Sequence, residues 1–87
     1  MAVIFYAKSA NIVAGSDNNS EAYVTFDNDA ENEKNKGADV VLKGNQSVAA
    51  IKEFKLYNLA SAEKYDAHAI NINVVGKGFK IYTFTFG

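Results

Sequence analysis

The sequence predicts one domain of the α+β class, in which an antiparallel sheet of four or five strands carries one helix on one face. The length of 87 residues suffices for one hydrophobic core and not for two, so we expect residues 1–87 to form a single domain. Residues 21–27 and 69–86 alternate apolar and polar side chains with the two-residue period of half-buried strands. Helix-forming residue types dominate residues 47–66, which predict the helix.

The N-terminal part of the chain predicts a hairpin. Residues 3–14 are rich in strand-forming residues that three polar side chains interrupt near the middle, so we expect one bent strand or two short ones. Residues 15–20 are of types that favour turns, and residues 21–27 return as a second strand.

The middle of the chain allows an alternative fold class. Residues 28–37 carry no large apolar side chain and predict a solvated, flexible loop, and residues 38–43 predict a third strand. If residues 47–57 form a strand paired with residues 38–43, the domain is instead an all-β sandwich. The helix is the preferred interpretation because its apolar side chains fall on one broad face: Val48, Ile51, Phe54, Leu59, Ala62 and Tyr65.

The C-terminal residues predict a second hairpin, in which Gly76-Lys77-Gly78 forms the turn. In the register that we expect, Ile72 lies opposite Tyr82, and Ile70 lies opposite Phe84. The last strand then has apolar side chains on both faces, and part of this surface is predicted to meet another chain. The candidate contact residues are Tyr82, Phe84 and Phe86.

The residue types exclude most catalytic chemistry. The chain has no cysteine, so it offers no disulfide, thiolate metal site or cysteine nucleophile. Its single histidine, His68, has no pattern of ligands or of a nucleophile around it, and we expect an ordinary surface or half-buried side chain. Two stretches with alternating oxygen ligands lack the glycine and the final glutamate of a calcium loop. We therefore predict no enzyme, no catalytic residue, no cofactor and no metal.

Charge and hydropathy point to a protein partner. All nine basic residues are lysine, so the arginine forks that hold phosphates and guanine edges are missing, which makes nucleic acid an unlikely partner. No apolar run approaches the roughly 20 residues of a membrane span. Neither a leader nor a membrane segment is recognised, so we expect a cytoplasmic protein, in the host cytoplasm if it is viral. An acidic segment is predicted to dock on a basic surface through Asp27, Asp29, Glu31 and Glu33.

These observations favour a non-catalytic protein-binding module. One form of this hypothesis is a small virus-encoded inhibitor that blocks a larger host macromolecule such as a defence enzyme. A self-assembling structural subunit, such as a homodimer, is the alternative. A single-strand nucleic-acid binder that stacks bases on tyrosine and phenylalanine comes third.

Overall fold

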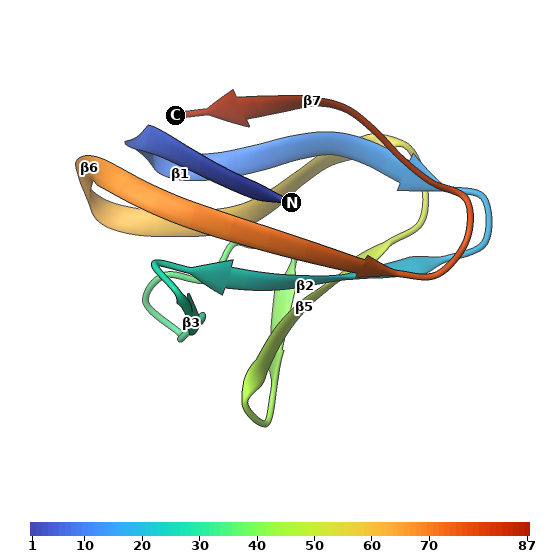
Figure 1. Ribbon diagram of the computed structural model, residues 1–87, viewed down its shortest axis with the longest axis horizontal. Helices are drawn as coiled ribbons and strands as arrows, with labels where there is room; N and C mark the ends of the chain where they lie inside the picture. The colour runs from blue at the N-terminus through green and yellow to red at the C-terminus, as the bar shows by residue number, and fades with distance from the viewer.

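The computed structural model describes residues 1–87 and shows seven β-strands and no helix (Figure 1). The strands form one antiparallel sheet in the order β4-β5-β2-β6-β1-β7, and the short β3 pairs with β2 beside this path. The chain has no helix with the length and apolar character that crossing a membrane requires. The strands are β1 (Ala2–Ser16), β2 (Ser20–Phe26), β3 (Asp29–Ala30), β4 (Val40–Lys43), β5 (Gln46–Ile51), β6 (Lys55–Val75) and β7 (Phe79–Phe86).

Two long strands, β1 and β6, fold the sheet over on itself. Residues 2–7 of β1 pair with residues 66–71 of β6, and residues 9–14 pair with residues 55–61. The register shifts between Ala7 and Ser9, and Figure 1 shows both strands doubling back on themselves. Bulges of this kind bend strands and increase their twist. The bend was expected from the polar interruption in the first strand.

The bend creates two layers with the core between them. The first layer holds β4, β5, β2, the C-terminal half of β6 and the N-terminal half of β1. The second holds the N-terminal half of β6, the C-terminal half of β1, and β7. The alternation predicted for residues 21–27 is confirmed, because every second side chain of β2 points inward. The largest fully buried side chains come from both layers and include Ile12, Ile51, Leu59, Ile70 and Ile72.

The α+β prediction is wrong, and the all-β alternative fits. Residues 47–66, the predicted helix, lie in β5, in the following turn and in β6. Phe54 and Tyr65, which a helical face would bury, are exposed, whereas Tyr57 is buried although it lies outside that face. Backbone pairing decides the structure of these residues and overrides their local helix propensity, because β5 pairs with β4 and β2, and residues 55–61 pair with β1.

The predicted pairing of the C-terminal strands is also wrong, although both strands exist. β7 pairs with β1, while β6 pairs with β1 on one edge and with β2 on the other. The edges of β6 are therefore taken before β7 begins. Gly76 and Gly78, both at positive φ, carry the chain across from one layer to the other.

A bulge in β7 decides which of its side chains are buried. Thr83 pairs with Val13 and Ile81 pairs with Ala14, so Tyr82 is an extra residue without a partner. The extra residue changes the alternation, and Ile81 and Phe84 consequently both pack against the core. Tyr82 and Phe84 therefore do not share a face, contrary to the sequence-based expectation.

In the N-terminal half of β6, the edge that is not paired with β1 is met by residues 35–39, here called the covering segment. The Gly37 N–H donates to Leu59 O (3.2 Å), and the Ser61 N–H donates to Asn35 O (3.0 Å). A Cβ at Gly37 would lie 2.1 Å from the backbone oxygen of Asn58, so only glycine permits this approach. Part of the stretch predicted as a flexible loop is thus held by backbone bonds.

Candidate functional site

The four acidic residues predicted to bind a partner are separated by the structure. Asp27, Asp29 and Glu33 are exposed and Glu31 is buried, and the Asp27 side chain also contacts other residues of the chain. Asp27 begins the β2–β3 turn at a φ of 51°. Its carboxylate accepts a hydrogen bond from the Ala69 N–H and lies 2.9 Å from His68 Nδ1. Partial burial raises the pKa of Asp27, but these two contacts outweigh it, and the net pKa lies below its usual value.

His68 takes part in this structural contact with Asp27 rather than in a reactive site. Its ring packs against Phe26, with ring centroids 4.7 Å apart, and against Phe5 at 5.9 Å. Nε2 is buried and has no hydrogen-bond partner, so it faces no group to which it could pass a proton. The Asp27–His68 pair therefore ties the β2–β3 turn to β6.

Glu31 is buried, with 5% of its surface exposed, and neither carboxylate oxygen has a hydrogen-bond partner. Burial raises the pKa of Glu31 to about 8, although the charge of Lys36 acts in the opposite direction. The carboxyl is consequently neutral at pH 7 and contributes no charge to the surface. Of the four predicted acidic contacts, Asp29 and Glu33 remain free for a partner.

The three aromatic residues predicted to bind a partner also lie in different places. Tyr82 is 65% exposed on the outer side of the bulge, and Phe84 packs against the core. Phe86 stacks on Phe5, with ring centroids 4.8 Å apart, at one end of the sandwich. Only Tyr82 lies on the outer face of the second layer.

Tyr82 is part of an exposed apolar surface that the sequence did not indicate. The ring of Phe54 lies directly over Gly15, where a Cβ would come within 2.3 Å of it, and its centroid is 5.6 Å from that of Tyr82. Val13 and Leu56 pair on the same outer face. We call this set the outer apolar patch: Val13, Phe54, Leu56 and Tyr82. The helix prediction assigned Phe54 to the core, so the sequence analysis missed it.

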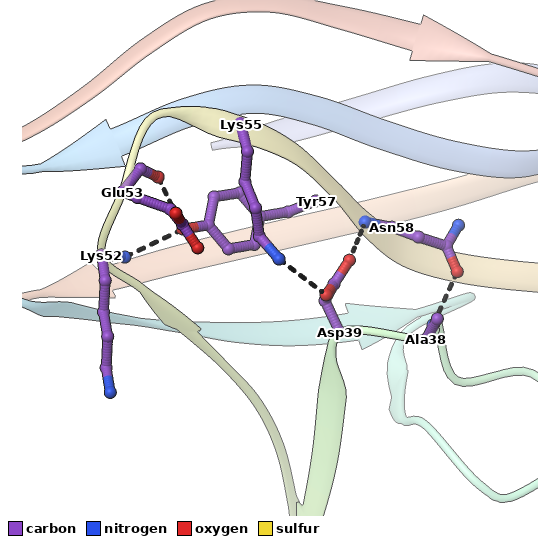
Figure 2. Close-up of polar contacts among 7 residues, drawn as sticks. All are labelled: Ala38, Asp39, Lys52, Glu53, Lys55, Tyr57 and Asn58. Carbon is purple, nitrogen blue, oxygen red and sulfur yellow. Dashed lines mark hydrogen bonds and ion pairs between the residues drawn. The ribbon is translucent and has the colours of Figure 1, made fainter.

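A second feature, a hollow lined by charged groups, lies where β5 turns into β6 (Figure 2). The Tyr57 hydroxyl donates to Glu53 O (2.7 Å) and accepts from the Lys52 N–H (3.0 Å). Asp39 accepts from the Asn58 N–H (2.7 Å) and forms an ion pair with Lys55 at 3.4 Å. These contacts fix the turn and the end of the covering segment, so the hollow has a structural role.

A third feature is a shallow groove on the first layer, beside β2. Its polar lining is entirely uncharged and consists of hydroxyl and amide groups. Such groups can donate to and accept from an uncharged ligand. The polar residues are Tyr23, Thr25, Asn45, Gln46, Ser47 and Asn73. Ser47 is buried, and its hydroxyl already donates to Val24 O and accepts from the Glu31 N–H, so the other five are the candidate contacts.

The structure contains no group of three or more histidine, aspartate or glutamate side chains that could hold a metal ion. Comparisons with curated proteins and with solved structures found no match. The family model described as "Thioredoxin like C-terminal domain" matches residues 1–87. This match does not support the prediction of a virus-encoded inhibitor, which is set aside. Because the match covers the whole sequence, the chain belongs to the thioredoxin-like C-terminal domain family.

Proposed function

We propose that this chain is a non-catalytic protein-binding module that serves a thioredoxin-like domain. We take the family description, "Thioredoxin like C-terminal domain", to name a domain that accompanies a thioredoxin-like domain, because this chain is all-β and has no cysteine. Thiol–disulfide exchange requires a thiolate, and this chain has no cysteine. Any such chemistry would therefore belong to the thioredoxin-like domain, and the contribution of this chain would be binding.

The outer apolar patch is the observation that carries the proposal. Phe54 is seated on Gly15, and the β7 bulge presents Tyr82, so two aromatic rings are held in place before a partner arrives. The residues beside the patch are polar: Asn11, Asn58 and Thr83 are uncharged, and Lys80 lies opposite Gly15 in the pairing of β1 with β7. An aromatic centre with a polar rim is typical of protein interfaces, and preorganised rings lose little entropy on binding. The proposed partner surface is on the thioredoxin-like domain itself.

The test is a titration of the ¹⁵N-labelled chain with a separately produced thioredoxin domain. Amide shifts should concentrate at Phe54, Leu56 and Tyr82. The double variant Phe54→Ser/Tyr82→Ser should weaken binding by about tenfold or more, since buried aromatic anchors dominate interface energies. Val41→Ser, which changes an exposed apolar residue on the first layer, is the matched control. Binding that is absent, or unchanged in the double variant, would reject the proposal.

A second candidate function rests on the groove beside β2. Its tyrosine and amide side chains, without any charge, suit a ligand rich in hydroxyl groups such as an oligosaccharide. An NMR titration with a soluble oligosaccharide should then shift the Asn73 and Tyr23 signals, and Asn73→Ala should abolish the effect. Unshifted groove signals at millimolar ligand would exclude this function.

Three earlier expectations stay predictions. Docking of a basic protein surface was expected through Asp27, Asp29, Glu31 and Glu33, and it is testable by reversing these charges to lysine, which should lower the association rate. Nucleic-acid binding is testable by salt-dependent retention on single-stranded DNA. A cytoplasmic location is testable by fractionation of cells that produce the protein.

A further inference from the structure

The N-terminal half of β1 has one edge with no neighbouring strand. Met1 and Ile72 exchange two hydrogen bonds, at 2.9 and 2.7 Å. Hydrogen-bonded and non-bonded pairs alternate along an antiparallel ladder, so the next bonded pairs with β6 are those of Val3 and Phe5. Ala2, Ile4 and Tyr6 lie between them, and their backbone N–H and C=O groups point away from β6.

These backbone groups have no partner in the structure. β7 pairs with β1 only from Ala10 onward, and no turn, loop or side-chain hydrogen bond reaches Ala2, Ile4 or Tyr6. Just beyond them, the N–H of Lys8 donates to the Gly87 carbonyl oxygen at 2.7 Å, which closes the edge. The result is a short, open row of alternating donors and acceptors.

The open edge lacks the features that usually prevent strand pairing. Residues 2–7 contain no charged side chain, proline or bulge. The side chains of Ile4 and Tyr6 are 81% and 72% exposed beside the open edge. The outer edge of β7, by comparison, carries Lys80 and the bulge at Tyr82, and β4, at the other end of the sheet, is only four residues long and carries Lys43. Of these three edges, that of β1 is therefore the best suited to accept a strand.

We propose that residues 2–6 of β1 form a homodimer interface by pairing antiparallel with the same residues of a second copy of this chain. The register follows from the groups that face outward: Ile4 lies opposite Ile4 of the second copy, and Ala2 lies opposite its Tyr6. Each of these pairs exchanges two hydrogen bonds.

The segment is complementary to itself, which is why the occupant is a second copy. The small Ala2 leaves room for the ring of Tyr6 across the interface, and the two Ile4 side chains meet at the twofold axis. No like charges are brought together, because residues 2–6 carry none. The first layers of the two copies join into one continuous sheet. The outer apolar patch lies on the second layer, so the dimer leaves it free for another partner.

The test uses the charge of residue 4, because the proposed register places this residue opposite itself. Ile4→Lys and Ile4→Glu should each be monomeric by light scattering and sedimentation from about 10 µM to about 1 mM, a range in which the unchanged protein shows a dimer. An equimolar mixture of the two variants should form the dimer again, because opposite charges then meet. Val41→Lys, on the exposed face of β4, is the matched control and should dimerise normally.

A second measurement does not depend on any variant. On dilution of the unchanged protein, amide shifts should change at Ala2, Ile4 and Tyr6 and stay constant at Phe54 and Tyr82. A chain that is monomeric throughout this range overturns the proposal. A dimer that persists in Ile4→Lys, or a mixture of the two charged variants that stays monomeric, also overturns it.

Discussion

The edge of β6 at residues 58–61 and the edge of β1 at residues 2–6 differ in what lies against them. The covering segment pairs with the β6 edge through bonds such as the Asp39 N–H to Asn58 O, at 3.2 Å. The Asn58 side chain adds a bond from the Ala38 N–H, at 2.6 Å (Figure 2). The β1 edge has no such cover.

The difference teaches that a loop without apolar side chains can protect a sheet edge as well as a strand can. The covering segment buries little hydrophobic surface. Hydrogen bonds of its backbone groups, of Asn58 and within the preceding turn keep it in place. In that turn, Asn32 Oδ1 accepts from the backbone N–H groups of Lys34 and Asn35. A free edge is therefore recognised by its backbone pairing rather than by its hydropathy.

Gly37→Ala should have the largest effect on stability, because it disturbs the covered edge of β6. The added Cβ would meet the backbone of Asn58, which has no flexible side chain that could move aside. We expect a loss of about 3 kcal/mol in the free energy of unfolding, measured by denaturant titration. Gly44→Ala is the control for backbone strain alone: Gly44, unlike Gly37, is at positive φ, and it has nothing within 4 Å of its Cβ position, so only about 1 kcal/mol should be lost. Equal losses in the two variants would mean that the covering segment is not closely packed.

The pH dependence of stability should report on the covered edge of β6, because Glu31 leads into the covering segment. Its folded pKa of about 8 lies above the ordinary value of 4.5, so the folded state binds the proton more tightly. Stability is then complete below pH 4.5 and falls as the pH rises to about 8. Local opening lets the carboxylate ionise in water without global unfolding, which limits the loss of unfolding free energy. We expect a loss of about 2 kcal/mol over this range. Denaturant titrations of Glu31→Gln should lack this component, and an identical pH profile would contradict the assignment.

Hydrogen exchange compares the two edges directly. At concentrations where the protein is monomeric, the amides of Ile4 and Tyr6 should exchange about tenfold or more faster than those of Gly37 and Ser61, after correction for intrinsic rates. The reason is that the first pair has no acceptor and the second pair donates to backbone oxygens. NMR exchange rates give this measurement. Comparable protection at both edges would show that the β1 edge is covered after all.

Ile4→Ala should have the smallest effect. Ile4 is mostly exposed, so the unfolding free energy of the monomer should change by less than about 0.5 kcal/mol. Ile12, on the same strand, is fully buried between β6 and β7, and Ile12→Ala should cost about 3 kcal/mol. Thermal or denaturant unfolding distinguishes the two, and a large loss for Ile4→Ala would place this side chain in the core.

Strands with one buried and one solvent-exposed face were predictable from the sequence, and strands with irregular alternation were not. β2 follows a strict two-residue period, which is why residues 21–27 were assigned correctly. The bulge in β7 changes the alternation of side chains at Tyr82, and no residue type in this strand predicts it. Residues 47–66 mix lysine, glutamate and alanine with apolar residues, so their local composition favours a helix, and pairing with β1, β2 and β4 overrides it.

The candidate site was less predictable than the fold, because it depends on long-range placement. Glu31 and Glu33 look alike in the sequence, yet one is buried and the other exposed. The contact of Phe54 with Gly15 joins residues from β1 and from the β5–β6 turn, which only the folded chain brings together. Tyr82 was identified through its aromatic character, although the reason for its exposure is the bulge.

The extra residue in β7 also determines which changes of length the last strand tolerates. Removing one residue near Tyr82 would restore simple alternation and send Ile81 or Phe84 out to solvent, whereas replacing Tyr82 would leave both where they are. Evolution can thus vary the side chain that this strand displays without disturbing the core, provided that the count of residues stays the same.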